Sequence, residues 1–263
     1  MANAFQTDVD NARGALQLPG ERAPAAEREH RKLRLAQALR VFGHLGFEHG
    51  LAGHFSARDP IDPTLFWINR LGTPFLKTRV SDLVLVDRHE TIHAGRGPIN
   101  RSGVPYHDTI QVAREDIVGI AHAHAFWGKT WSAFRRPVTN LTADASFFLS
   151  DQSLFDPLSE NDGQVGRDQK AIAAAKALGR RNVLIWFNHG IWTVGRTVES
   201  AAWRFLAFED AAHSQLVAEA AGVLQPPADS ALEPDREQRE IFAHFSFLAL
   251  WDRISEDHED VEA

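Results

Sequence analysis

Short apolar runs alternate with longer helical segments along the chain, and this alternation most strongly limits the possible fold. Helical spacing of apolar side chains predicts helices over residues 27–47, 106–113, 171–178, 197–222 and 238–254. Apolar runs typical of buried strands lie between them, at 66–68, 83–86, 117–121 and 183–187. No internal repeat and no linker in the middle of the chain interrupts this order. We therefore expect one α/β domain with a helical C-terminal extension.

The boundaries follow from where this pattern starts and stops. Residues 1–26 are expected to form a mobile lead-in, because Pro19, Gly20 and Pro24 break any periodicity. Residues 27–224 form the predicted α/β domain, and 225–263 a helical extension with a solvated acidic tail. The spacing in the last helix is compatible with two roles, packing on a neighbouring subunit or covering a pocket.

Composition removes several classes of function. The 263 residues include no cysteine, which excludes disulfide scaffolds, thiolate zinc sites and cysteine nucleophiles. Any metal must therefore be held by His, Asp, Glu or backbone oxygen.

The net charge of −7 argues against nucleic-acid binding by general electrostatics. No apolar run approaches the roughly 18 residues of a membrane span, and the N-terminus lacks the apolar core of a secretory signal. We expect a cytoplasmic protein.

Histidines at predicted strand ends carry the strongest chemical signal. His122 and His124 end one apolar strand, where residues two apart share a face, and His189 ends another beside Gly190. Three imidazoles with an open coordination position suit a catalytic Zn, Fe or Mn site. The alternative is that each is an ordinary hydrogen-bonded core histidine.

Further motifs at characteristic spacing accompany these histidines between about Arg31 and Gly222. They are Gly53–Pro60, Ser81–Asp87, Pro98–Asn100, His107, His122–His124, Asn188–Gly190, Gly195 and Glu209. In order and spacing they resemble the class II aldolase/adducin family. The resemblance implies a three-layer α/β/α sandwich with a mainly antiparallel central sheet. It also implies a divalent metal on His122, His124 and His189, and a homotetramer with active sites near subunit interfaces.

Several positions depart from the pattern of the family's sugar-phosphate aldolases. Gly103 stands where their metal-binding, proton-shuttling Glu is found, so Gly103→Glu is expected to strengthen metal binding if residue 103 faces the ion. Their Gly-Asn-x-Ser phosphate loop reads Gly53-His54-Phe55-Ser56 here. The only tyrosine is Tyr106, so the tyrosine of their C-terminal segment is missing. These departures argue against a sugar-phosphate aldolase.

The remaining candidate residues follow from these departures. We expect His107, His54 and Arg101 to act in catalysis, with either histidine in place of the missing Glu. Residues expected to bind the substrate are Ser56, Arg58, Ser102, Trp127, Trp131 and Trp192. The basic groups suit a carboxylate as well as a phosphate. The aromatic residues suggest a dry pocket for an aromatic substrate, with ordinary core packing as the alternative.

Two enzyme classes and one non-catalytic class remain. The first is a metal enzyme that breaks a C–C bond of a non-phosphorylated, aromatic oxo or hydroxy acid, with Fe(II) and O2 favoured. This resembles the non-haem iron oxygenases of aminocoumarin antibiotic biosynthesis, which shorten a prenylated hydroxyphenylpyruvate to a hydroxybenzoate. The second is a Zn(II)- or Mn(II)-dependent aldolase, decarboxylase or epimerase that acts on a sugar-like or hydroxy-acid substrate. The third, an adducin-like interaction module, fits less well because the metal histidines are retained.

Overall fold

The computed structural model describes residues 16–20, 22–157, 166–222 and 235–263. Much of the expected lead-in, and the boundary expected at 224/225, lie outside these ranges. The helices are α2 (Pro24–His44), α3 (Val104–Ala113), α4 (Phe126–Ser132), α5 (Arg167–Leu178), α6 (Val198–Ala221) and α7 (Arg236–Ile254). Short 3-10 helices are η1 (Phe75–Lys77), η2 (Val80–Asp82), η3 (Asp144–Phe148) and η4 (Ser255–Glu262).

The strands form one eight-stranded sheet in the order β4-β3-β2-β1-β5-β8-β7-β6. They are β1 (His54–Arg58), β2 (Phe66–Asn69), β3 (Leu83–Val86), β4 (Ile92–Ala94), β5 (Gly119–Ala123), β6 (Gln152–Phe155), β7 (Val183–Trp186) and β8 (Gly190–Gly195). Neighbouring strands in this sheet are antiparallel except β6 and β7. The strand expected at 117–121 begins two residues later, because the N–H of Ile117 turns back to the carbonyl of Arg114.

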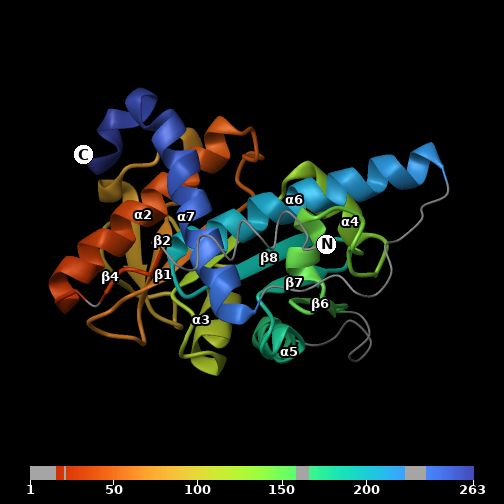
Figure 1. The fold of residues 1–263 in the computed structure, drawn as a ribbon. Coiled ribbons are helices and arrows are strands. Elements are labelled where there is room, and N and C mark those ends of the chain that lie inside the picture. Colours follow the sequence, from red (N-terminus) through yellow and green to blue (C-terminus); the bar gives the residue numbers. More distant parts are fainter. Residues whose placement is uncertain (1–15, 21, 158–165, 223–234) are drawn as a thin grey trace.

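Helices cover both faces of the sheet (Figure 1). Alternate residues of each strand point to opposite faces, so Ala121 and Ala123 join the core beneath α2, α6 and α7. Ile120 faces the other way, into a core shared with α3 and α5. These layers confirm the predicted three-layer α/β/α sandwich with a mainly antiparallel sheet.

The C-terminal extension belongs to the same core. Helix α7 packs on α6 and α2, and Phe247 is fully buried there. The acidic side chains of residues 256–262 are exposed, as expected for a solvated tail, but the segment is also anchored. Val261 is buried, and Asp260 pairs with Arg40 at 3.0 Å and with Arg79 at 2.8 Å. These few anchoring contacts of Val261 and Asp260 could not be predicted from the acidic composition of the segment. Over the described ranges, no helix combines the length and apolar character needed to cross a bilayer.

Candidate active site

Three imidazoles meet where β5 ends and β8 begins. His122 lies on β5 opposite Trp192 of β8, His124 follows β5 directly, and His189 lies in the turn from β7 to β8. The turn is tight: Asn188 has a φ of 56° and Gly190 a φ of 146°. One ligand nitrogen from each histidine lies within 4.8 Å of the others. The structure therefore brings together the three histidines that the sequence analysis selected as metal ligands.

Hydrogen bonding prepares these nitrogens for a cation. Nδ1 of His122 lies 2.8 Å from the carbonyl oxygen of Ile191, which can only accept, so this nitrogen carries the proton. Its Nε2 therefore presents a lone pair, 3.2 Å from Nε2 of His189. An outward hydrogen bond of this kind typically orients a metal-bound imidazole. Two nitrogens converging on one position, with one tautomer fixed, fit a divalent metal.

Burial keeps the three imidazoles uncharged. It lowers the pKa of His122 and His124, and lowers the pKa of His189 to about 4. Neutral imidazole is the form that ligates metals, so no proton has to leave at neutral pH.

Two tryptophans stack against the imidazole rings of the cluster. Trp192 stacks on His122 with ring centroids 4.6 Å apart, and Trp186 stacks on His189 at the same separation. Both tryptophans are buried. Trp186 was missed in the sequence analysis, although its position three residues before His189 at the end of a predicted strand was a usable signal.

A second, buried cluster lies beside the three histidines. Nδ1 of His54 is 2.6 Å from Nε2 of His107, and Nδ1 of His107 is 2.6 Å from the Ser56 hydroxyl. The amide of Gln111 donates to the same hydroxyl at 3.3 Å. Burial lowers the pKa of His107 to about 3. Gln111 was also missed, although it lies four residues after His107 and so shares its helix face.

His54 fills the space beside Gly103. A Cβ atom placed on Gly103 would lie 2.6 Å from both Cε1 and Nε2 of the His54 ring. The ring itself lies 5.0 Å from that of His122, centroid to centroid. A glutamate at position 103 would have to displace His54. The expectation that Gly103→Glu simply adds a ligand therefore does not hold, because the position next to the metal ligands is already occupied by an imidazole.

Of the basic and hydroxyl candidates, only Ser56 lies in this buried cluster. The Arg58 guanidinium donates to the carbonyls of Ile117 and Arg114, both at 2.9 Å, and so ties down the end of α3. Arg101 is exposed and forms an ion pair of 3.6 Å with Glu90. The exposed Ser102 donates to the Asn100 side chain. The contacts of Arg58 correct its expected role in substrate binding: its guanidinium donates hydrogen bonds to backbone carbonyls instead.

Most of the aromatic candidates are packing residues. Trp131 is fully buried and donates its indole N–H to the carbonyl of Arg136. Trp127 stacks on His213 with ring centroids 3.9 Å apart. For these two the alternative of ordinary packing holds, and Trp192 alone of the three contacts the cluster. The pocket of aromatic side chains expected from the sequence is therefore not formed by these residues.

Glu209 anchors the segment that follows His124. Its carboxylate accepts the backbone N–H groups of Trp127 at 3.0 Å and Gly128 at 2.6 Å, at the start of α4. Burial raises the pKa of Glu209 to about 7. The residue therefore holds the start of α4 in place rather than entering the histidine cluster.

The fold and the histidine cluster define an α/β/α protein with a candidate metal centre at the ends of the central strands β5 and β8. Residues 33–216 match the Class II Aldolase and Adducin N-terminal domain, and the chain belongs to this family. The resemblance inferred from the motifs is thereby confirmed.

Two relatives from streptomycetes are named as enzymes. The chain is 36% identical to the 4-hydroxy-3-prenylphenylpyruvate oxygenase/4-hydroxy-3-prenylbenzoate synthase of Streptomyces roseochromogenus subsp. oscitans, over 79% of this chain and 75% of that protein. It is 37% identical to Decarboxylase NovR of Streptomyces niveus, over 75% and 73%. Among solved structures, the L-fuculose 1-phosphate aldolase of Glaciozyma antarctica PI12 superposes with a TM-score of 0.80 at 30% identity, over 94% of this chain and 97% of that one. These names support an enzyme of the class II aldolase family.

Proposed function

We propose that the chain is a metal-dependent enzyme that cleaves a C–C bond of an aromatic oxo or hydroxy acid, by oxidative decarboxylation with Fe(II) and O2. One observation carries the proposal: three neutral imidazoles converge, and within the described residues the group that can hold a metal contains no carboxylate. His122, His124 and His189 would hold the ion. A divalent metal there supplies a Lewis acid for the substrate's carboxylate and adjacent oxygen and, as Fe(II), electrons for the reduction of O2.

The residues around the centre have distinct roles in this proposal. His54 faces the cluster in place of a ligand side chain at position 103, and His107 and Ser56 fix its orientation. Trp186 and Trp192 exclude water from one side of the centre. The names of the streptomycete relatives support a phenylpyruvate-type acid as the substrate class. We further propose a cytoplasmic homotetramer.

A second candidate is a Zn(II)- or Mn(II)-dependent aldolase, decarboxylase or epimerase. The superposition on an L-fuculose 1-phosphate aldolase favours it. Gly103 and the engagement of Arg58 with carbonyls speak against a phosphorylated sugar. This candidate also requires the three histidines, so the two differ in the metal and in the use of O2.

The test is metal analysis of protein purified without oxygen, followed by O2 uptake with 4-hydroxyphenylpyruvate after loading with Fe(II). Iron bound at one ion per chain with substrate-dependent O2 consumption supports the oxygenase. Zinc or manganese with substrate turnover but no O2 uptake supports the second candidate.

The double variant His122→Ala/His124→Ala should lose the metal and remain folded, whereas His93→Ala, at an exposed histidine, should keep the metal. A double variant that retains stoichiometric metal refutes the assignment of the ligands.

A further inference from the structure

The His54 imidazole has one nitrogen without a partner in the described part of the chain. Its Nδ1 lies 2.6 Å from Nε2 of His107, whereas its Nε2 forms no hydrogen bond with any described residue. The indole nitrogen of Trp192 is buried without a partner, but Nε2 of His54 is not sealed from solvent in this way. A ligand can therefore reach this nitrogen.

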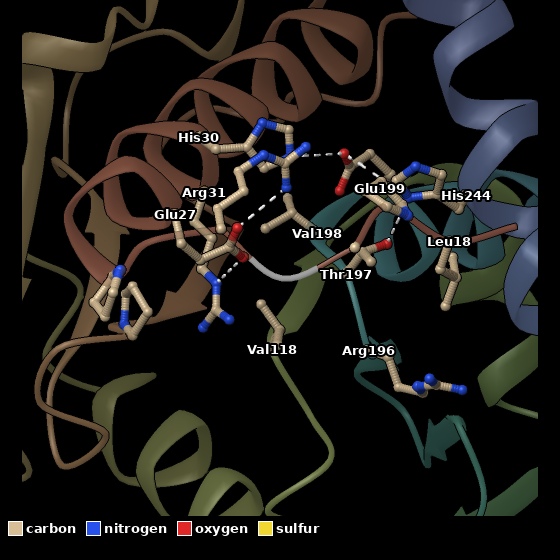
Figure 2. Close-up of a pocket in the computed structure, with 15 residues that line it drawn as sticks. Leu18, Glu27, His30, Arg31, Val118, Arg196, Thr197, Val198, Glu199 and His244 are labelled. Carbon is tan, nitrogen blue, oxygen red and sulfur yellow. Dashed lines mark hydrogen bonds and ion pairs between the residues drawn. The ribbon is translucent and has the colours of Figure 1, made fainter.

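The buried charge in the cavity at the start of α6 differs in this respect (Figure 2). There Glu199 lies 3.1 Å from Nε of Arg34 and 3.7 Å from Nε2 of His30. These groups satisfy one another's charge. The free nitrogen of His54 is instead left for a group from outside the chain.

The His54 ring lies next to a candidate metal ligand. Residues 54 and 122 are opposite each other on β1 and β5, and the ring centroids of His54 and His122 are 5.0 Å apart. A Cβ atom placed on Gly103 would lie 2.6 Å from Nε2 of His54. This edge of the ring therefore occupies the space that a longer side chain at position 103 would need beside the metal ligands.

The hydrogen bonds behind His54 determine which of its nitrogens carries the proton. The buried Ser56 hydroxyl accepts from the Gln111 amide at 3.3 Å and lies 2.6 Å from Nδ1 of His107. Among the described residues, this Nδ1 is the acceptor within reach of the hydroxyl proton. Ser56 therefore donates to His107, and Nε2 of His107 donates to Nδ1 of His54. The proton of His54 is then on Nε2.

Only the reverse direction of this chain would leave Nε2 of His54 with a lone pair. In that case Nδ1 of His107 would donate to Ser56, whose own proton would have no acceptor, and a buried unsatisfied donor costs about 1–3 kcal/mol. A fourth metal ligand or a general base needs a lone pair at this position. With its proton on Nε2, a neutral His54 can be neither and can only donate.

We propose that His54 is a hydrogen-bond donor that orients the acid at the metal centre, and that Gln111 and Ser56 are positioning residues that keep its proton on Nε2. The proposal rests on the function proposed above. The Nε2–H group donates to an anionic oxygen of the acid. A compound without an acceptor at this place leaves the donor unsatisfied and binds more weakly.

The tautomer of His54 can be measured in the metal-free native chain, so this test depends neither on the metal nor on the reaction. Long-range proton–nitrogen NMR of protein with isotope-labelled histidine distinguishes rings protonated on Nε2 from rings protonated on Nδ1. Signals are assigned by their loss in His54→Gln and His107→Gln. Both rings should carry the proton on Nε2. A His54 ring protonated on Nδ1 alone overturns the proposal.

Gln111→Glu should reverse the direction of the chain. At about pH 8 a carboxylate can only accept, so it takes the Ser56 proton, His107 donates through Nδ1, and Nε2 of His54 is left with a lone pair. This nitrogen can then act as a ligand, so the affinity for Zn(II), measured by competition with a chelator, should rise about tenfold. Gln111→Met removes the amide without adding an acceptor and should change neither the tautomer nor the affinity.

A folded Gln111→Glu variant whose His54 stays protonated on Nε2 would show that Gln111 and Ser56 do not set the tautomer. A reversed tautomer with unchanged Zn(II) affinity would show that His54 does not face the ion. If Gln111→Glu does not fold, the spectrum of the native chain still decides.

Binding of phenylpyruvate to the Zn(II)-loaded protein, measured by calorimetry, tests the role of the donor. His54→Leu, which removes the N–H group, should weaken binding about five- to tenfold, whereas His54→Gln, whose amide can donate, should weaken it by about twofold or less. Equal binding by the native chain and His54→Leu overturns this role. A native chain that binds no metal refutes the proposed function instead, and leaves the tautomer of His54 as measured.

Discussion

Replacing Gly103 by alanine tests whether the His54 imidazole occupies the space beside this glycine. The backbone does not require glycine there, because the φ of −83° and ψ of −32° are ordinary helical values. The added methyl group would lie 2.6 Å from two atoms of the imidazole. The ring must therefore move, and its 2.6 Å hydrogen bond to His107 must break or distort.

The size of the effect follows from three contributions. Overpacking a buried site costs about 1–3 kcal/mol. Loss of the hydrogen bond between His54 and His107 adds about 1 kcal/mol. Alanine restricts the unfolded chain more than glycine does, which returns about 0.4–1 kcal/mol. Gly103→Ala is therefore expected to lower the free energy of unfolding by about 1–3.5 kcal/mol.

A double-mutant cycle with His54→Ala isolates the contact. The free energy of unfolding is measured by urea denaturation of the metal-free protein for the native chain, both single variants and the double variant. With His54 absent, Gly103→Ala should be neutral or slightly stabilising, which gives a coupling energy of about 2 kcal/mol. A Gly103→Ala variant as stable as the native chain, or an equal loss in both backgrounds, would show that His54 does not pack against position 103.

Three further predictions concern stability. Burial lowers the pKa of His107 to about 3, so as the pH falls below 6.5 the imidazole takes up a proton in the unfolded chain before it does so in the folded chain, and stability is lost. In urea denaturation, the contribution of His107 to the free energy of unfolding should be about 2 kcal/mol smaller at pH 5 than at pH 7. Unchanged stability would refute the burial of His107 as a neutral imidazole. Arg204→Met leaves Glu240 buried without its 2.6 Å partner, and should cost about 3–5 kcal/mol, partly restored by adding Glu240→Gln; a loss below about 1 kcal/mol would contradict this. Removal of residues 256–263 exposes Arg40 and removes the buried side chain of Val261, so the free energy of unfolding should fall by about 1.5 kcal/mol or more. An unchanged melting temperature would mean that residues 256–263 are not packed against the rest of the chain.

The sequence was most informative where one residue type recurred at a regular position. His122, His124 and His189 each follow or end an apolar strand, and the C-terminal ends of β5 and β7 lie at the same end of the sheet because both strands are antiparallel to β8 between them. Five of the described helices were predictable for the same reason, since apolar periodicity marks the buried face, whereas the short helix α4 was not predicted. Trp192 could be placed near the site because it lies close to His189 in the chain.

Contacts between distant segments could not be predicted in this way. The pairing of His54 with Gly103 depends on the register of β1 against β5, which sets His54 opposite His122. The role of Arg58 depends on backbone carbonyls at the end of α3. Every residue has such a carbonyl, so the sequence does not show which of them an arginine will contact. The docking of Asp260 on Arg40 joins the two ends of the chain across 220 positions. Charge alone predicts a solvated tail, because it does not show which cation lies within reach.

The same contacts bear on substrate choice under the proposed function. Three neutral imidazoles leave a divalent ion with its full charge of two, whereas a glutamate at position 103 would cancel half of it. The surroundings are buried and backed by Trp186 and Trp192, so charges attract more strongly there than in water. Arg58 is committed to backbone carbonyls and Arg101 is exposed beside Glu90, so neither is positioned to take over the recognition of an anion. Selectivity for an acid would then come from the charge of the ion itself. A carboxylate with an adjacent carbonyl or hydroxyl oxygen can occupy two coordination positions at once, which a neutral sugar cannot match in charge, and this favours an oxo or hydroxy acid over a carbohydrate.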